Sequence, residues 1–228
     1  MNYQGKVRDV MTLAHELGHG VHQVLSAQQG ALMADTPLTL AETASVFGEQ
    51  LTFQYLLARE TNPAAKKRLI AGKIEDMLNT VVRQIAFYNF ETALHSDRRE
   101  GELSVDVISA HWMRTQAASF GSAVHLDESY RVFWTYVSHF FHTPFYVYAY
   151  AFGDCLVNSL YAIYEEEKQT GNGITFETKY IEMLRSGGRF RHTELLAPFG
   201  IDISQPDFWQ KGLNHIARLI DVLEQDEG

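Results

Sequence analysis

Apolar and polar residues follow a helical spacing along most of the chain. Between residues 64 and 95, steps of three and four residues separate Leu69, Ile70, Ile74, Met77, Leu78, Val81 and Val82. Such steps place apolar side chains on one face of an amphipathic helix. Similar patterns predict helices over residues 9–27, 39–60, 64–95, 104–119, 129–140, 147–170, 176–186, 192–198 and 205–225.

Short runs that contain proline, glycine or charged residues separate these segments. They are "TNP" at residue 61, "REGE" at 99, "HTP" at 142, "TGNG" at 170 and "SGG" at 186, and runs of this kind commonly end helices. Only "MNY" at the start could continue a strand. We therefore predict an all-α fold.

Composition narrows the class of protein. The chain has 228 residues, 46% of them hydrophobic and 21% charged, which is enough for the core of one large domain over residues 1–228. A net charge of −9 argues against nucleic acid as a partner. Pro144 and Asp154 interrupt the most apolar stretch, residues 141–157, so no membrane span is expected.

The chain has a single cysteine, Cys155, and no apolar leader follows Met1. An intrachain disulfide is therefore impossible, and a reducing, cytoplasmic location is expected. The neighbours of Cys155 in "FGDCLVNSL" are typical of a packed helix. We expect a buried and unreactive thiol.

The strongest chemical signal is "TLAHELGHGVHQ", residues 12–23. His15 and His19 are four residues apart, so a helix places both imidazoles on one face, where two nitrogens can bind one cation. Glu16 lies about 100° around the helix from His15, where its carboxylate can take a proton from water. The H-E-x-x-H pattern predicts a zinc site with Glu16 as general base. A catalytic zinc takes three protein ligands, so a third ligand is required.

Glu42, in "LTLAETASVFGEQLTF", is the candidate third ligand. It lies on the next predicted helix, which can present it to the histidine pair. A second interpretation stays open, because Thr39 and Glu42 have the T-x-x-E spacing of a capping box. Ser45 and Glu49 follow on the same helical face and could hydrogen-bond to the ligand histidines. The alternative for Glu49 is an ordinary surface carboxylate.

Three more residues of the first block carry predictions. His22 lies near the face of His15 and His19, and we interpret it as a packed or supporting histidine rather than a fourth ligand. Gly18 and Gly20 each lower helix propensity by about 1 kcal/mol relative to alanine. A helix that contains both is expected to have another segment packed closely against it.

Two later blocks extend the pattern. One is "VSHFFHTPFYVYAYAFG", residues 137–153, and the other is the C-terminal "YIEMLRSGGRFRHTELLAPFGIDISQPDFWQKGLNHIARLIDVLE". Together with "TLAHELGHGVH" and "AETASVFGE", they resemble the M3 family of zinc oligopeptidases, and within it the oligoendopeptidase F branch. The resemblance implies a zincin-like helical catalytic domain that holds one Zn²⁺ through His15, His19 and Glu42.

The resemblance also implies roles for the second block. Members of the family use a histidine and tyrosines there to bind substrate and stabilise the oxyanion, which corresponds to His139, Tyr146 and Tyr150, with Tyr148 as a further candidate. The tyrosines alternate after Pro144, which indicates an extended or irregular segment. Without the resemblance, an aromatic core stripe is the simpler interpretation.

Two glycine positions bear on this comparison. Gly187 and Gly188 resemble a flexible loop that contacts peptide in the family, and the alternative is a helix C-cap. Gly153 stands where the related thimet-oligopeptidase-like branch carries a further tyrosine. That departure weakens the transfer of the oxyanion role.

Members of the family are considerably longer and carry the zinc helix in the second half of the chain. "MNYQG" resembles the end of the strand before that helix. We therefore expect residues 1–228 to be a C-terminal catalytic part without its N-terminal lobe, either as a short form or as part of a longer enzyme. A further partner would then be another chain that supplies this lobe, or a second copy of the same chain through self-association.

The expected function is a zinc-dependent metalloendopeptidase that hydrolyses short oligopeptides. Zn²⁺ activates water, Glu16 transfers the proton, and Tyr150 with Tyr146 or His139 stabilises the oxyanion. The alternative is a catalytically inactive zinc-binding fragment or half of a two-chain peptidase. A zinc enzyme that acts on another amide ranks lower.

Overall fold

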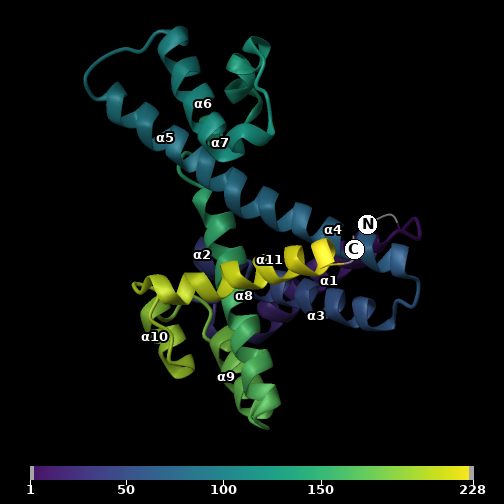
Figure 1. Ribbon diagram of the computed structural model, residues 1–228. Helices are drawn as coiled ribbons and strands as arrows, with labels where there is room; N and C mark the ends of the chain where they lie inside the picture. Colours follow the sequence, from purple (N-terminus) through teal and green to yellow (C-terminus); the bar gives the residue numbers. More distant parts are fainter. Residues whose placement is uncertain (1–2, 226–228) are drawn as a thin grey trace. The chain divides into compact units, whose positions relative to one another are not determined.

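The computed structural model describes residues 3–225, and every regular element in that range is a helix (Figure 1). The all-α prediction is therefore confirmed. Met1 and Asn2, on which most of the possible "MNY" strand falls, lie outside the described residues. Within residues 3–225, no helix is long and apolar enough to cross a membrane.

The Cα positions divide into two compact units. The first comprises residues 1–75 and 153–228, and the second comprises residues 76–152. The division falls within two helices, α4 (Pro63–Leu78) and α8 (Tyr148–Gln169).

In the first unit, α1 (Val7–Ser26) packs along α3 (Thr43–Arg59). The two backbones lie close together at Gly18, where an added Cβ would lie 2.5 Å from the Cα of Ser45. A Cβ on Gly20 would meet nothing within 4 Å. The prediction of a close neighbour is thus confirmed for Gly18 and wrong for Gly20, because the two residues point to different sides of the helix.

The rest of the first unit is built around α8. Helix α9 (Gly173–Arg185) and helix α3 enclose an aromatic cluster with it, in which the Phe47 ring centroid lies 4.5 Å from that of Tyr180 and 5.9 Å from that of Tyr161. Helix α11 (Pro206–Gln225) crosses α8, and the Ser159 hydroxyl donates to the Phe208 carbonyl over 3.0 Å (Figure 1). The remaining short elements are α2 (Leu38–Ala41), a 3-10 turn at Ala27–Gln29, α10 (His192–Leu196) and a 3-10 turn at Ala197–Phe199.

Cys155 lies buried on α8, as predicted. Burial, reinforced by the neighbouring Asp154 carboxylate, raises the pKa of the thiol to about 12. The thiolate is therefore scarce at neutral pH, and the thiol is unreactive.

The second unit has its own core. Helix α5 (Gln84–Arg98) packs against α6 (Val105–Phe120), and the buried residues of this core are mainly aromatic. They are Phe87, Phe90, Trp112, Val137 and Val147. The predicted helix over residues 64–95 forms as α4, a π-helical turn at Asn79–Arg83, and α5.

The predicted helix over residues 129–140 is wrong in type. The structure has a 3-10 helix over Glu128–Tyr136 and the short helix α7 (His139–His142), with another 3-10 turn at Gly121–Ala123. The Trp112 indole donates to the Tyr130 carbonyl over 3.1 Å. An α-helix would use that carbonyl for the amide of Trp134, so the core contact competes with α-helical hydrogen bonding.

Candidate metal centre

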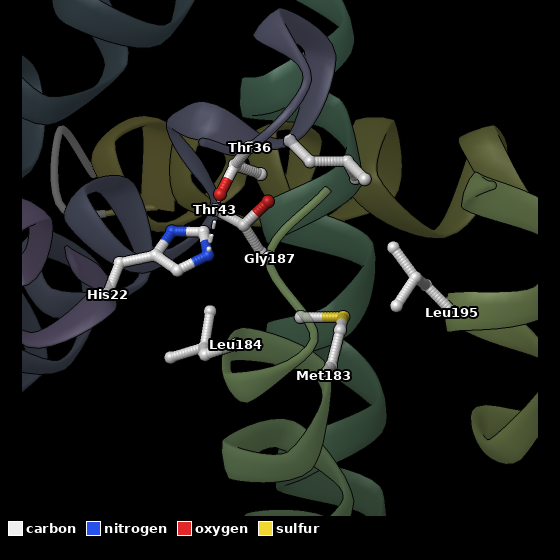
Figure 2. Close-up of a pocket in the computed structure, with 8 residues that line it drawn as sticks. His22, Thr36, Thr43, Met183, Leu184, Gly187 and Leu195 are labelled. Atoms are coloured by element: carbon white, nitrogen blue, oxygen red, sulfur yellow. Dashed lines mark hydrogen bonds between the residues drawn. The ribbon is translucent and has the colours of Figure 1, made fainter. Parts of the chain in front are cut away.

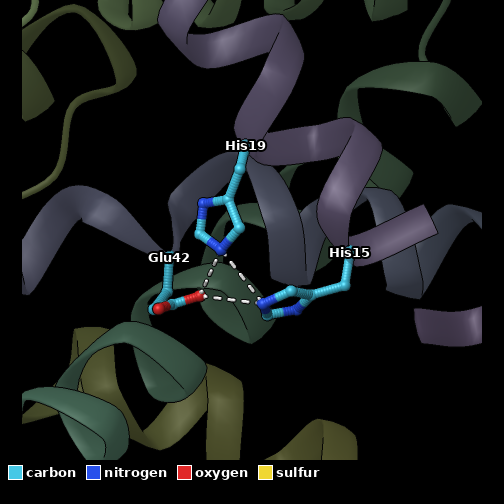
Figure 3. A group of neighbouring side chains, drawn as sticks. All are labelled: His15, His19 and Glu42. Atoms are coloured by element: carbon cyan, nitrogen blue, oxygen red, sulfur yellow. Dashed lines mark hydrogen bonds and ion pairs between the residues drawn. The ribbon is translucent and has the colours of Figure 1, made fainter. Parts of the chain in front are cut away.

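Three side chains converge at the contact between α1 and the start of α3 (Figure 3). The Nε2 atoms of His15 and His19 lie 3.1 Å apart, and each lies 3.4 Å from Oε2 of Glu42. A tetrahedral ion with metal–ligand bonds of about 2.0–2.1 Å separates its ligand atoms by about 3.3–3.4 Å. The triangle therefore has the size that one zinc ion requires.

The donor set and the exposure also fit zinc. Two imidazole nitrogens and one carboxylate oxygen are the ligands of many catalytic zinc sites, which leave a fourth position for water. The side chains of His15, His19 and Glu42 are 27%, 29% and 24% exposed. A groove lined in part by Gln23 and Asp35 adjoins the triangle at His19.

Neighbouring polar side chains hold two members of the triangle. Glu49 Oε1 lies 2.6 Å from Nδ1 of His15, so an Nδ1–H donating to this carboxylate leaves Nε2 free as a ligand. The hydrogen bond to Glu49 raises the pKa of His15, although burial opposes the shift. Ser45 donates to Glu42 Oε2 over 2.8 Å. The predicted contact of Glu49 with a histidine is present, whereas Ser45 holds the carboxylate instead.

A break in the predicted helix over residues 39–60 places Glu42. Helix α2 ends at Ala41, α3 begins at Thr43, and Glu42 lies between them with φ −85° and ψ 0°. Thr39 lies inside α2, and the N-cap of α3 makes no side-chain hydrogen bond. The capping box is therefore not formed, and the Glu42 carboxylate is free to face α1.

Glu16 and His22 occupy different surroundings on α1. Glu16 is exposed next to His15. His22 is buried, with Nε2 3.1 Å from the Thr36 hydroxyl, and Figure 2 shows it facing a small cavity lined by Thr36, Leu184 and Gly187. Burial lowers the pKa of His22. It is packed, as predicted, and is not one of the three converging residues.

Gly187 and Gly188 follow the end of α9. Gly187 has φ +52°, and the Gly188 amide donates to the Met33 carbonyl over 2.8 Å. A Cβ on Gly187 would lie 2.3 Å from that carbonyl. The glycines thus end a helix in contact with the 33–35 segment, as the C-cap interpretation predicted. Contact with peptide stays a prediction.

His139, Tyr146 and Tyr150 meet within the second unit. The Tyr146 ring stacks on His139 with centroids 5.4 Å apart, and it lies 5.1 Å from the Tyr150 ring. The Tyr150 hydroxyl lies 3.3 Å from Nε2 of His139. These three residues form one cluster of the second unit, whereas His15, His19 and Glu42 belong to the first unit.

The extended segment predicted for the tyrosines is wrong beyond Val147, because α8 begins at Tyr148. Tyr146 and Tyr150 are four residues apart, and the Tyr146 carbonyl accepts from the Ala149 amide as the helix starts. One turn therefore separates their rings, which lets both reach His139. Tyr148 points elsewhere, with its ring 5.8 Å from that of Tyr88.

Gly153 lies beside the triangle of His15, His19 and Glu42, and a Cβ there would be 3.4 Å from Cβ of Glu42. Sequence reasoning missed Glu91, which is fully buried and accepts a hydrogen bond from the Phe145 amide. A single glutamate inside an amphipathic helix carries no signal of such a contact, because its partner is 54 residues away in the chain.

A helical chain that combines an H-E-x-x-H helix with a carboxylate from the junction of the next two helices, α2 and α3, has the donor arrangement of a zincin-like protein,. The model of peptidase family M3 matches residues 1–215. The chain belongs to this family.

Individual relatives agree with this assignment. An oligoendopeptidase F homolog of Borreliella burgdorferi is 30% identical over 90% of this chain and 34% of its own length. The chromosomal oligoendopeptidase F of Lactococcus lactis subsp. cremoris is 26% identical over 97% of this chain and 37% of its own length. The crystal structure of oligoendopeptidase-F from Enterococcus faecium superposes with a TM-score of 0.72 at 25% identity, covering 94% of this chain and 40% of that one. The chain thus spans little more than a third of the length of these relatives.

Proposed function

We propose that this chain carries the catalytic centre of a zinc-dependent endopeptidase for short peptides. The observation that supports the proposal most strongly is the triangle of His15, His19 and Glu42, whose edges match one tetrahedral zinc ion. The names of the relatives, oligoendopeptidase F, support short peptides as the substrate class.

The residues of the chain have different roles in this reaction. His15, His19 and Glu42 would hold the ion, which supplies Lewis acidity toward the scissile carbonyl and toward water. The exposed Glu16 carboxylate accepts a proton from the attacking water and passes it to the nitrogen of the leaving amine. Glu49 keeps the His15 ring in the tautomer whose Nε2 is a ligand,.

The cluster of His139, Tyr146 and Tyr150 serves the same reaction in this proposal. A phenol O–H or an imidazole N–H donates to the oxygen that becomes negative when water attacks the carbonyl. In the contact between Tyr150 and His139, an Nε2–H of His139 that donates to the phenol oxygen directs the Tyr150 O–H toward the carbonyl oxygen. The family resemblance of the "HTPFYVYAY" block supports this role.

Hydrolysis of a quenched fluorescent peptide tests the proposal. With zinc present, we expect turnover by the wild type and a loss of about 100-fold or more in kcat for Glu16→Gln, because general-base catalysis supplies a factor of this order. Glu177→Gln, an exposed glutamate on α9, is the matched control and should keep full turnover. Equal rates for the wild type and Glu16→Gln would contradict the proposed mechanism.

A second function is considered because the names of the relatives belong to proteins of which this chain matches only 34% and 37%. In this alternative, the chain is a zinc-binding part that requires a further lobe or chain for turnover. Stoichiometric zinc binding that raises the melting temperature, without any peptide hydrolysis, would select it.

A further inference from the structure

Glu91 on α5 is buried in a way that side-chain packing does not explain. Its exposed fraction is 0%, and its Oε2 atom has no hydrogen-bond partner. A buried carboxylate with an unsatisfied oxygen lowers stability relative to an apolar side chain of similar size. Its other oxygen, Oε1, accepts from the Phe145 amide over 2.9 Å.

Phe145, the donor of this hydrogen bond, lies in a tight turn. The Tyr146 amide donates to the Thr143 carbonyl over 3.1 Å, so Pro144 and Phe145 are the two central residues of the turn. Proline at the first central position and a positive φ at the second are the features of a type II turn. The amide of the second central residue takes no part in the turn's own hydrogen bond, and Glu91 is its acceptor.

The conformation of Phe145 is unfavourable by itself. Its φ is +61°, the only positive value for a residue other than glycine among residues 3–225. A side chain with a Cβ rarely adopts this region, and such strain persists only where the surroundings impose it. Two side chains of helix α5 contact Phe145 in this conformation. Glu91 accepts a hydrogen bond from the Phe145 amide, and the ring centroid of His95, one turn further along α5, lies 4.7 Å from that of Phe145.

The turn leads directly into the proposed oxyanion cluster. Tyr146, the last residue of the turn, stacks on His139 and also contacts the Tyr150 ring. A different turn conformation would rotate the Tyr146 backbone and move its ring away from His139. Burial raises the pKa of the Glu91 carboxyl, and the Phe145 amide and the nearby His95 and His139 oppose that shift.

We propose that Glu91 is a positioning residue, which holds the strained Pro144–Phe145 turn so that Tyr146, His139 and Tyr150 stay assembled for catalysis. The inference rests on the proposed endopeptidase function of that cluster. The length of the Glu91 side chain and its acceptor oxygen hold the turn, and its charge is not required.

Two substitutions separate these properties. Glu91→Gln keeps the length and an oxygen that can accept from the Phe145 amide, but removes the charge. Glu91→Asp keeps the charge but is one methylene too short to reach. We expect Glu91→Asp to lower kcat about tenfold or more with little change in KM, because a misplacement of this size impairs orientation in the transition state. Glu91→Gln should lose much less.

A double variant tests the role of backbone strain. Glycine adopts positive φ without a steric penalty, so Phe145→Gly in the Glu91→Asp background should recover part of the lost kcat. Gln116→Leu is the control for a general packing effect, because Gln116 is also 0% exposed, lies on α6 in the same unit, and has no partner for its side-chain amide. It should leave kcat within about twofold of the wild type, as substitutions outside the reacting cluster do.

A readout that does not need turnover keeps this inference distinct from the proposed function. Stacking on Tyr146 shields the His139 ring protons in NMR spectra, and this shift should be retained in Glu91→Gln and lost in Glu91→Asp. If the wild type has no activity, the NMR comparison still decides the positioning role. Glu91→Asp with wild-type kcat and an unchanged His139 shift would overturn the inference, as would loss of both properties in Glu91→Gln alone.

Discussion

The contact between α1 and α3 can be tested with two glycines on the same helix. In Gly18→Ala, the new Cβ would lie 2.5 Å from Ser45 Cα and 2.6 Å from the Ala44 carbonyl oxygen. Ordinary contacts between heavy atoms begin near 3.5 Å, so α3 must move by about 1 Å. These atoms belong to backbone, which cannot turn aside as a flexible side chain can.

The expected change in the free energy of unfolding of Gly18→Ala is the sum of two opposing effects. Overpacking of this kind lowers the free energy of unfolding by about 1–3 kcal/mol. The higher helix propensity of alanine raises the free energy of unfolding by about 1 kcal/mol. We therefore expect a net loss of up to about 2 kcal/mol for Gly18→Ala. Gly20→Ala meets nothing within 4 Å, so it should gain about 0.5–1 kcal/mol.

Gly18→Ala should also weaken zinc binding. Moving α3 displaces Ser45, which donates to the Glu42 carboxylate over 2.8 Å, and loss of such support costs about tenfold or more in metal affinity. Urea unfolding of the metal-free protein and chelator competition for zinc measure the two effects. Wild-type stability and zinc affinity in Gly18→Ala, or an equal loss in Gly20→Ala, would refute the reasoning.

Two further predictions concern buried or partly buried histidines. The hydrogen bond to Glu49 raises the pKa of His15, so its contribution to the stability of the metal-free protein is complete below about pH 6.5 and is lost as the pH rises through the raised pKa,. Glu49→Gln should flatten that dependence above about pH 6.5 in urea unfolding and lower zinc affinity about 10- to 100-fold. Unchanged values for both would be inconsistent with the role of Glu49. Burial, reinforced by Arg218 and Lys73, lowers the pKa of His215 to about 4, and its Nε2 accepts from the Gln50 amide over 2.8 Å. The stability of the wild type should therefore fall as the pH drops from 6.5 toward 4, and His215→Gln should reduce this fall relative to the wild type; identical pH curves would disprove the assignment.

The helices themselves could be predicted from the sequence, because local periodicity determines them. The pair His15 and His19 could be predicted for the same reason, since four residues make one helical turn. The type of helix over Glu128–Tyr136 could not, because it depends on the Trp112 indole, 18 residues away from the carbonyl that it contacts. Long-range contacts of this kind override local propensity.

The same limit applies to the candidate site. From spacing alone, Glu42 could be a cap or a ligand, and the choice depends on a break between α2 and α3 that no glycine or proline announces. Gly18 and Gly20 look alike in the sequence, yet only Gly18 faces α3. The start of α8 at Tyr148 could not be predicted either, because Phe145, which has a positive φ three residues before it, contacts Glu91, 54 residues away in the chain, and His95.

The central claim is that His15, His19 and Glu42 bind one zinc ion. Calorimetric titration of the metal-free protein with zinc tests it most directly, in the wild type, in Glu42→Ala, and in Glu16→Gln, whose carboxylate is not a proposed ligand. We predict one ion per chain for the wild type and Glu16→Gln, with affinity reduced by at least about 100-fold in Glu42→Ala, since a lost ligand weakens binding more than a lost supporting hydrogen bond. Wild-type affinity in Glu42→Ala would contradict the account.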